Sequence, residues 1–453
     1  MNIKYYPYTN HLMQDIHAGV CGEQSGILQS SILCPTRYDE DCNLISLTGQ
    51  MPYYHKVLID PAADVQYHLG GYGSYYEEAI IRYIGEGIER YSLLISPYMY
   101  HRNFKFASYN DIQNEGIVMP FEYLDIYSDE DIEKLNIGDR KVPFQRITRD
   151  SLIGWLKCPS LFNPAKEIWI PLQLLFTGYV TSRKQEEIKF SLGFSKGVAA
   201  HTTIEKALLS AILEFIEIDA TMINWYAQLK ADQIKIDDVS LLKQFPKYFS
   251  QDSTFEVRAS DLNIIKGLPA NVLGCQLVNR KKSKPLVVYG AQADFDPIKC
   301  FYRAFVESVA ITFLATYGVL YSPKEYLVKR THNNFSDLDT NVAYYADPNQ
   351  HEIKLELLGS MLGKTKLIST MQSFDSDNIE QKTHQLLTSL KGISEYAVYL
   401  DVTPPEAKEK GWHVVRTFFP ELVTMCLPGI PPRNHPRMLE YGGVKNDYPH
   451  PLP

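Results

Sequence analysis

Apolar residues recur every three or four positions in three long segments of the chain, and this period predicts three amphipathic helices. The expected helices cover about 76–94, 203–226 and 297–317. In the first, Ile80, Ile84 and Ile88 share one face, while charged side chains occupy another. Thr202 or Thr203 precedes the second helix and is placed to cap it.

Shorter apolar or alternating runs between these helices predict strands. The runs lie at 56–59, 168–177, 254–295, 396–402 and 413–417. We expect a surface helix and loop at 230–250 and a polar helix at 352–362. Because helices and strands do not alternate regularly, the expected fold class is α+β, with mixed sheets and packed helices. The expected organisation is an N-terminal strand and loop region, 1–65, followed by the main domain with a proline-rich tail, 66–453.

Composition and charge exclude several classes of function. The 453 residues include 45 Lys and Arg against 53 Asp and Glu, and 45% are hydrophobic, which is typical of a globular chain and not of a disordered one. The net charge of −8 argues against broad nucleic-acid binding. Seven cysteines without a C-x-x-C pair argue against a zinc ribbon or a disulfide scaffold. With neither a secretory signal nor an apolar run long enough to span a bilayer, we expect a cytoplasmic protein without a membrane partner.

A glycine-containing stretch from Gly359 to Thr365 resembles a phosphate-binding loop but lacks its spacing. Three residues separate Gly359 from Gly363, where the motif has four, and a helical pattern precedes it instead of a strand. We therefore interpret the stretch as the glycine-terminated end of a helix.

Charged side chains at helical spacing mark all three long helices. They are Glu86, Glu89 and Arg90 on the first, Glu214 and Glu217 on the second, and Arg303 and Glu307 on the third. Such sets share a helix face and usually lie on a solvated surface. However, Glu214 and Glu217 occur in an otherwise apolar segment, where unpaired carboxylates are costly. Carboxylates from several helices suit Mg2+ with a nucleotide phosphate, and arginines suit phosphate oxygens; a buried ion-pair network would explain the same spacing without a ligand.

These motifs resemble the YcaO superfamily. The strings are EGIERYS at 86–92, GVAAHTTIEKALLSAILEFIEIDA at 197–220 and RAFVE at 303–307, in that order. The resemblance covers roughly 65–453 and implies a YcaO-like fold with an ATP site that has no P-loop. It implies as Mg2+ ligands Glu86, Glu89, Glu214, Glu217 and Glu307. It implies as ATP-binding residues the same glutamates together with Arg90 and Arg303.

Four positions depart from the family pattern. The family usually has arginine at 218, a carboxylate at 206, often glutamine at 210, and lysine at 72. This chain has Ile218, Lys206, Ser210 and Tyr72. Lys206 would be able to contact phosphate directly, in place of a metal-held contact. The departures leave open a scaffold protein with an impaired ATP site.

The C-terminal residues form the pattern Pro-His-Pro-Leu-Pro. Proline fixes φ, so such a segment is stiff and extended, although an ordinary proline-containing tail has the same composition. In azoline-forming YcaO proteins a similar terminal pattern is thought to enter the active site. The resemblance thus implies catalytic roles for Pro449, Pro451 and Pro453, with the Pro453 carboxylate as the base. Because a histidine ordinarily titrates near neutral pH, His201 and His450 are further candidates for an acid or base, with a loop role favoured for His201.

The resemblance implies an ATP-dependent cyclodehydratase, most similar to the stand-alone D protein of streptolysin-type thiazole/oxazole-modified peptide clusters. It would convert Cys, Ser or Thr of a ribosomal precursor peptide to thiazoline or oxazoline by phosphorylating the backbone amide oxygen. The implied partners are this peptide, an E1-like peptide-clamp protein and a flavin-dependent dehydrogenase, without nucleic acid; a homodimer is left open. The alternatives are a non-catalytic scaffold in the same complex and a YcaO-type enzyme that forms thioamides or amidines.

Overall fold

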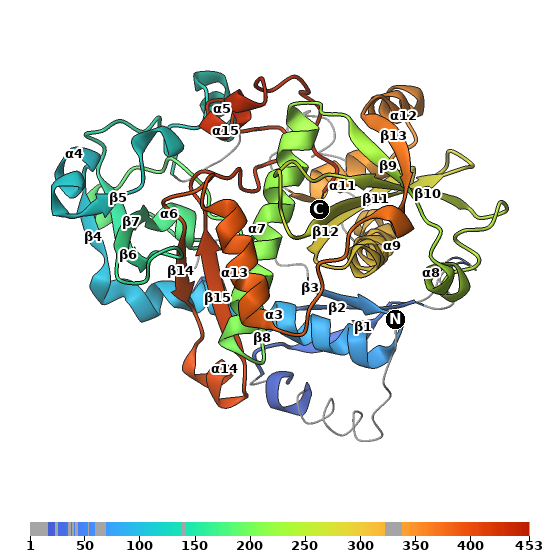
Figure 1. Ribbon diagram of the computed structural model, residues 1–453. Coiled ribbons are helices and arrows are strands. Elements are labelled where there is room, and N and C mark those ends of the chain that lie inside the picture. The colour runs from blue at the N-terminus through green and yellow to red at the C-terminus, as the bar shows by residue number, and fades with distance from the viewer. Residues whose placement is uncertain are drawn as a thin grey trace.

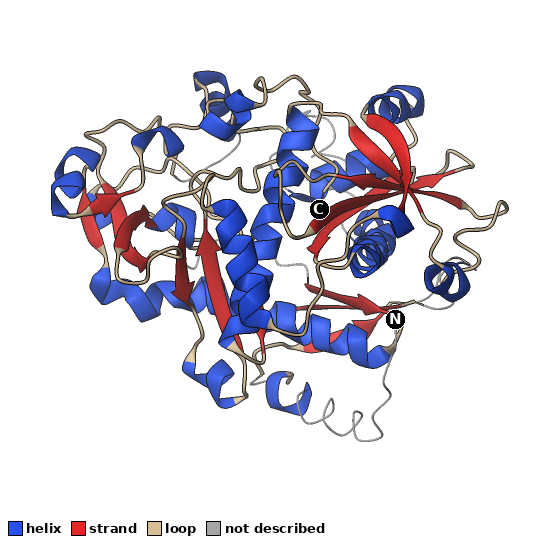
Figure 2. Ribbon diagram, in the orientation of Figure 1, coloured by secondary structure: helices blue, strands red, loops and turns tan. Residues whose placement is uncertain are grey.

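The computed structural model describes residues 17–22, 26–34, 38, 40, 44–52, 54–58, 69–137, 142–321 and 338–452. Within these residues, two antiparallel sheets and two mixed sheets are joined by long helices (Figures 1 and 2). The expected α+β class is therefore confirmed. The boundary expected after residue 65 lies outside the described residues, so the division into two parts stays a prediction.

The largest sheet has five strands in the order β12-β11-β10-β9-β13, with β13 parallel to β9 and the other neighbours antiparallel. Its strands are β9 (Ala231–Lys235), β10 (Phe255–Asp261), β11 (Asn271–Asn279), β12 (Val287–Asp294) and β13 (Leu362–Leu367). One face packs on helix α9 (Pro297–Tyr321), and the other on helix α7 (Ile204–Tyr226). Because both faces are covered, every residue of β11 is buried.

The N-terminal sheet leads into the first long helix. It contains β1 (Ser30–Leu33), β2 (Ile45–Gln50) and β3 (Leu69–Gly73), all antiparallel. Helix α3 (Tyr76–Tyr100) follows and packs back on β3. A Cβ at Gly71 would lie 2.0 Å from the carbonyl oxygen of Ala79, so only glycine allows this close approach of strand and helix.

Two further sheets complete the framework. The three-stranded sheet has the order β14 (Val398–Asp401), β15 (His413–Phe418) and β8 (Val198–His201). The four-stranded sheet has the order β4 (Lys105–Ala107), β6 (Ile153–Pro159), β7 (Glu167–Pro171) and β5 (Ile117–Val118). In Figure 1, α7 runs through the centre of the molecule between the five-stranded and four-stranded sheets. Its N-terminal part packs on β8 and β15.

Shorter helices cover the remaining edges. They are α2 (Tyr54–Leu58), α4 (Tyr109–Ile112), α5 (Asp129–Leu135), α6 (Leu172–Leu175), α8 (Val239–Gln244), α11 (Leu338–Ala346), α12 (His351–Ser360), α13 (Ile379–Leu390), α14 (Pro405–Glu409) and α15 (Pro436–Glu440). Single 3-10 turns are η2 (His101–Asn103), η3 (Gln113–Glu115), η4 (Phe121–Tyr123), η5 (Arg183–Gln185) and η6 (Ile368–Thr370). No helix in the described ranges is long and apolar enough to cross a membrane.

The three long helices and most of the expected strands are confirmed. Helix α3 continues past the expected end to Tyr100, and α9 to Tyr321. The cap of α7 is Thr203, whose hydroxyl accepts a hydrogen bond from the Lys206 N–H at 3.3 Å. The stretch at 359–365 is not a phosphate loop, because Gly363 and the residues after it belong to strand β13.

Three local expectations were wrong. The run at 56–58 belongs to helix α2, because Tyr54 packs on the ring of Tyr91 and donates its hydroxyl proton to the Gly26 carbonyl. Strand β7 ends at Pro171, which has no N–H for the ladder, and the apolar residues after it form α6. Residues 231–235 form strand β9 and not surface helix or loop, because they pair with β10 and with the distant β13.

Candidate functional site

The candidate site lies where α3, α7 and α9 approach one another over shared strands. Each pair of these helices shares a strand. Helices α3 and α7 both pack on β8, helices α7 and α9 both pack on β12, and helices α3 and α9 both pack on β3. Electrostatic interactions therefore link Glu89 with Glu214 and Glu217 with Glu307. The carboxylates of the three helices thus lie within electrostatic reach of one another.

On α3, the guanidinium of Arg90 holds both neighbouring carboxylates. Its Nη1 donates to Glu89 Oε1 at 2.9 Å, and its Nη2 donates to Glu86 Oε1 at 3.3 Å, one turn away. Glu86 Oε2 also accepts from the Gly70 N–H of β3 at 2.9 Å. Burial raises the pKa of Glu89 well above its usual value, Arg90 opposes this, and Glu214 adds to it.

On α7, the two predicted glutamates differ in their surroundings. Glu214 Oε2 accepts from the N–H groups of Gly197 and Val198 at 2.9 and 3.3 Å, where strand β8 begins. Glu217 is 2% exposed, and its Oε1 has no hydrogen-bond partner in the described part of the chain. Burial raises the pKa of Glu217 well above its usual value. The charge of Lys196 lowers this pKa, and the charge of Glu307 raises it further. Glu217 therefore has a buried oxygen without a hydrogen bond, whose ionic partner Lys196 is 3.9 Å away.

On α9, the glutamate is buried and the arginine lies nearer the surface. Glu307 Oε2 accepts from the Ala291 N–H at 3.1 Å and from Gln292 Nε2 at 3.4 Å, both on β12. Burial raises the pKa of Glu307. Arg303 pairs with Asp294, at 3.2 Å between Nη1 and Oδ2. The sequence reasoning missed Asp294, which is the last residue of strand β12, shortly before α9.

Lys196 is a second residue that the sequence reasoning missed. Its Nζ lies 3.3 Å from Glu214 Oε1 and 3.9 Å from Glu217 Oε1, and its side chain is 16% exposed. Burial lowers the pKa of Lys196, but Glu214, Glu217 and Glu307 raise it more, so that the ammonium stays protonated. A lone lysine in the glycine-containing approach to α7 was the available signal.

Arg416 on β15 fixes the segment that carries Lys196. Its Nη1 donates to the carbonyls of Phe194 and Lys196 at 2.9 and 2.6 Å, and its Nη2 to that of Leu174 at 2.9 Å. The side chain is 1% exposed, and burial lowers the pKa of its guanidinium to about 10. Arg416 therefore positions Lys196 through the main chain.

The residues that depart from the family pattern have defined places. Ile218 is fully buried in the main core, so packing explains it. Tyr72 on β3 lies under the guanidinium of Arg82 at 5.5 Å, and burial and then Glu307 raise its pKa. His201 is not in a loop, as was expected, but is the last residue of strand β8, where its Nδ1 accepts a hydrogen bond from the Thr202 N–H at 2.8 Å. Burial lowers the pKa of His201, and Lys206 and Arg303 add to this.

The segment before the C-terminus is built into the fold. Trp225 Nε1 donates to the Tyr448 carbonyl at 2.9 Å, and the Tyr345 hydroxyl donates to that of Pro449 at 2.7 Å. Asn341 Nδ2 donates to the carbonyls of His450 and Leu452 at 2.8 and 2.6 Å. Pro449, Pro451 and Leu452 are buried, whereas Pro453 lies outside the described residues.

His450 has a structural environment. Its side chain is fully buried, and its Nε2 lies 3.1 Å from the Cys426 carbonyl oxygen, to which the neutral imidazole donates. Burial lowers the pKa of His450 to about 4. At neutral pH the imidazole is therefore uncharged, and its buried environment disfavours proton uptake.

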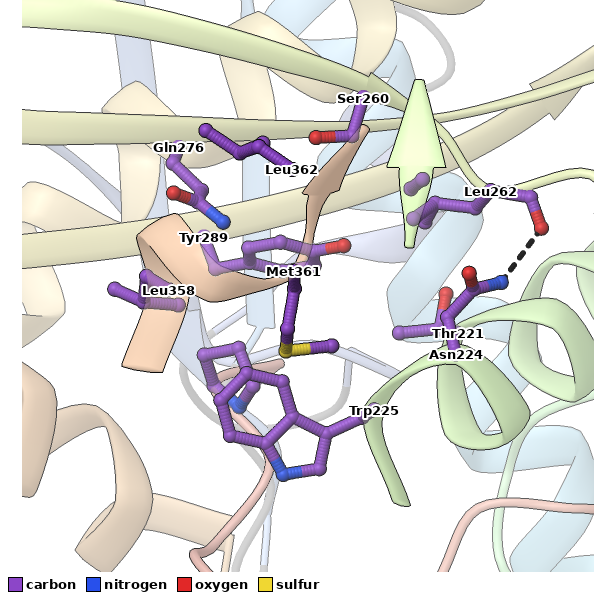
Figure 3. Close-up of a pocket in the computed structure, with 12 residues that line it drawn as sticks. Thr221, Asn224, Trp225, Ser260, Leu262, Gln276, Tyr289, Leu358, Met361 and Leu362 are labelled. Atoms are coloured by element: carbon purple, nitrogen blue, oxygen red, sulfur yellow. Dashed lines mark hydrogen bonds between the residues drawn. The ribbon is translucent and has the colours of Figure 1, made fainter. Parts of the chain in front are cut away.

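A small pocket is lined by α7, by the five-stranded sheet and by Pro451 of the C-terminal segment (Figure 3). Thr221 and Trp225 of α7, Gln276 and Tyr289 of the five-stranded sheet, and Pro451 are among its lining residues. Burial raises the pKa of Tyr289, and the charges of Cys275, Glu217 and Glu307 add to this, so Tyr289 lies near the carboxylates. Tyr289 therefore belongs both to the pocket wall and to the surroundings of the carboxylates, and Pro451 lines the same pocket.

The donor set suits Mg2+ with a nucleotide phosphate, since carboxylate oxygens are hard ligands and guanidinium and ammonium groups bind phosphate. The Glu217 oxygen without a hydrogen bond fits this use. No three Asp, Glu, His or Cys side chains of the described ranges come close enough together to hold a metal ion. Arg90 and Lys196 occupy the near sides of the carboxylates, so metal binding requires these cations to move.

Comparison with known families gives a match to YcaO cyclodehydratases, described as binding ATP and Mg2+, over residues 70–423. Comparison with curated proteins found no match. The family description supports the expected cofactors, ATP and Mg2+.

Solved structures share the fold. A heterocyclase in complex with substrate and cofactor has 17% identity and a TM-score of 0.70, covering 97% of this chain and 55% of its own. YcaO from Methanopyrus kandleri bound with AMPPCP and Mg2+ has 12% identity and a TM-score of 0.60, covering 92% and 91%. The E. coli microcin synthetase McbBCD complex with pro-MccB17 has 14% identity and a TM-score of 0.59, covering 96% and 99%. The chain thus spans about half the length of the heterocyclase.

Proposed function

The chain belongs to the YcaO family, and from this premise we propose that it is an ATP-dependent cyclodehydratase that forms azoline rings in a ribosomal precursor peptide. The observation that carries the proposal is the buried Oε1 of Glu217, which has no hydrogen bond and lies among carboxylates from three helices and the ammonium of Lys196. A buried oxygen without a hydrogen bond is unfavourable unless a ligand satisfies it. Bound Mg2+ would satisfy it and would neutralise phosphate charge during transfer.

In the proposed reaction, the Cys, Ser or Thr side chain of the peptide attacks the preceding amide carbon. The former amide oxygen takes the γ-phosphoryl group of ATP and then leaves as phosphate, while the nucleophile and the nitrogen each lose a proton. The peptide loses one water overall, and ADP remains. Phosphorylation is needed because an amide oxygen is a poor leaving group, and fixed positive charge near the phosphate assists its transfer.

The proposed roles follow the expectations from the sequence. Glu86, Glu89, Glu214, Glu217 and Glu307 would hold Mg2+ and, through it, the ATP phosphates. Arg90 and Arg303 would bind phosphate oxygens, and the structure adds Lys196 as a third cation at the site. Each of these cations is now paired with a carboxylate, so each must exchange that partner for phosphate.

The buried C-terminal segment favours azoline formation over thioamide or amidine formation. Four hydrogen bonds from Trp225, Tyr345 and Asn341 fix the main chain from Tyr448 to Leu452. This anchoring holds Pro451 in the wall of the pocket. The role of the Pro453 carboxylate as a base stays a prediction, because Pro453 lies outside the described residues.

A streptolysin-type stand-alone D protein is the finer assignment that we propose. Such a protein would need an E1-like peptide-clamp protein to deliver the precursor, and a flavin-dependent dehydrogenase would oxidise the azoline. The microcin synthetase, solved as a McbBCD complex with pro-MccB17 bound, is an example of a multiprotein assembly with this fold.

A non-catalytic scaffold is the second candidate, because Lys196 already neutralises two of the proposed metal ligands. The two functions differ in whether the precursor peptide loses water. We would incubate the purified chain with a candidate clamp protein, its precursor peptide and Mg2+-ATP, and record the intact peptide mass and the released phosphate. Water loss that requires ATP and matches phosphate release would support the enzyme; bound peptide of unchanged mass would support the scaffold.

Two sets of variants test the residues. Glu217→Gln should abolish water loss, whereas Glu205→Gln, an exposed change on the same helix, should not. Removal of Leu452 and Pro453 should stop cyclisation while the melting temperature stays within a few degrees of wild type. Normal cyclisation by the truncated chain would exclude a role for this segment.

A further inference from the structure

The pocket of Figure 3 contains a buried polar group without a partner. Gln276 on β11 is 7% exposed, and its Oε1 has no hydrogen-bond partner among the described residues. It pairs across the sheet with Tyr289 of β12, so both side chains point to the α7 face, where the pocket lies. An unsatisfied buried acceptor favours a ligand that brings a hydrogen-bond donor.

The chemistry of the lining limits this ligand. No charged side chain of the described chain lines the pocket, so neither phosphate nor a metal ion would find a counter-charge there. The walls combine apolar side chains, such as Trp225 and Pro451, with the amide of Gln276. The cavity volume of about 30 Å3 corresponds to roughly two water-sized groups. The pocket therefore suits a small, uncharged group with one donor.

The location relates this ligand to the carboxylate site. Thr221 lines the pocket and donates its hydroxyl proton to the Glu217 carbonyl at 2.7 Å, one helical turn earlier. Tyr289 lies within electrostatic reach of Glu217 and Glu307, and Pro451 closes another side. A group in the pocket therefore lies against Thr221, one turn after Glu217, and against Pro451 of the C-terminal segment.

We propose that this pocket receives the Cys, Ser or Thr side chain that is to cyclise, and that Gln276 Oε1 accepts a hydrogen bond from its thiol or hydroxyl. The proposal rests on the proposed function and adds the means by which the substrate residue is selected. A hydroxymethyl or thiomethyl group has two heavy atoms and fits the volume. A methyl side chain would leave the Gln276 acceptor unsatisfied.

Peptide binding without ATP tests this pocket independently of catalysis. The probes are acetylated, amidated Gly-Gly-Ser-Gly-Gly and its Cys and Ala analogues, titrated by saturation-transfer difference NMR. Wild-type protein should bind the Ser and Cys peptides at least about fivefold more tightly than the Ala peptide. Gln276→Leu, which keeps the size but removes the acceptor, should abolish this preference. Gln233→Leu, on strand β9 outside the pocket lining, is the matched control and should retain it.

Circular dichroism and the melting temperature establish that each variant folds, and Gln276→Met replaces Gln276→Leu if the latter does not. Equal affinities of wild type for all three peptides, including absence of measurable binding, would overturn the proposal. An unchanged preference in the Gln276 variant would overturn it as well. If only the proposed function were wrong, the protein would still bind the Ser and Cys peptides more tightly than the Ala peptide, but the precursor peptide would lose no water with ATP.

Discussion

Replacing Lys196 by methionine removes the ammonium that lies between two glutamates of α7. Its Nζ is 3.3 Å from Glu214 Oε1 and 3.9 Å from Glu217 Oε1. At an effective dielectric constant of about 20, unit charges at these distances attract each other by about 5 and about 4 kcal/mol. Desolvation offsets most of this, and loss of one partner from a buried pair typically costs about 3–5 kcal/mol. Since Lys196 and Glu214 are 16% and 23% exposed, we expect Lys196→Met to lower the free energy of unfolding by about 2–3 kcal/mol.

Urea denaturation followed by circular dichroism measures this loss. The matched control is Lys184→Met, an exposed lysine in η5, which should change the free energy of unfolding by less than about 0.5 kcal/mol. If Mg2+ binds the same carboxylates, it should restore more stability to Lys196→Met than to wild type, because no ammonium competes with it.

Calorimetric titration with Mg2+ alone and with Mg2+-ATP separates the two roles of this lysine. Lys196→Met should bind Mg2+ alone more tightly than wild type, and ATP more weakly, because the ammonium is lost to phosphate. An unfolding free energy equal to that of wild type, together with unchanged Mg2+ and ATP affinities, would refute the reasoning.

Three further predictions concern positioning and stability. Arg437→Met should cost about 3–5 kcal/mol in urea unfolding, because it leaves the fully buried Asp219 carboxylate without its guanidinium. Arg416→Lys should weaken ATP binding about tenfold in calorimetry while the circular dichroism spectrum is retained, because it loosens the main chain that carries Lys196. Burial lowers the pKa values of His435 and His450 to about 4, so the stability that each contributes is fully present above pH 6.5 and is lost as the pH falls toward 4. The loss is about 3 kcal/mol per histidine, and in urea titrations at several pH values His450→Gln should reduce the acid sensitivity.

The helical periods were sufficient to predict α3, α7 and α9 and the charged faces they carry, because helical spacing alone decides which side chains share a face. Lys196 could not be predicted in the same way. The Lys196 side chain reaches Glu214 because Arg416 holds the main chain at Lys196 by a hydrogen bond to its carbonyl. Arg416 lies 220 residues away in the sequence. Strand β9 was missed for a similar reason, since its pairing with β13 joins distant segments.

Local sequence also carried no sign of the pocket. Gln276 lies in the middle of an otherwise apolar strand, where a single amide is ordinarily satisfied by a neighbour. Only the tertiary structure shows that its acceptor has no partner and that Pro451 closes the space beside it. The tail pattern predicted a segment with a defined place, but not the Asn341 and Tyr345 contacts that hold it.

Two ion pairs on different sides of α7 help to decide between a permanent network and a ligand site. The Asp219 carboxylate accepts hydrogen bonds from the Arg437 guanidinium at 2.7–3.0 Å and from the Val423 N–H at 2.8 Å, which is the geometry of a structural pair. Glu217, two residues earlier, meets its cation only at 3.9 Å and keeps an oxygen without a hydrogen bond. If the ion pairs served stability alone, Glu217 would be expected to have hydrogen bonds as short as those of Asp219. An underpaired buried carboxylate is costly. The looser pair is therefore better explained by exchange of Lys196 for a bound cation, and this favours the enzyme over the scaffold.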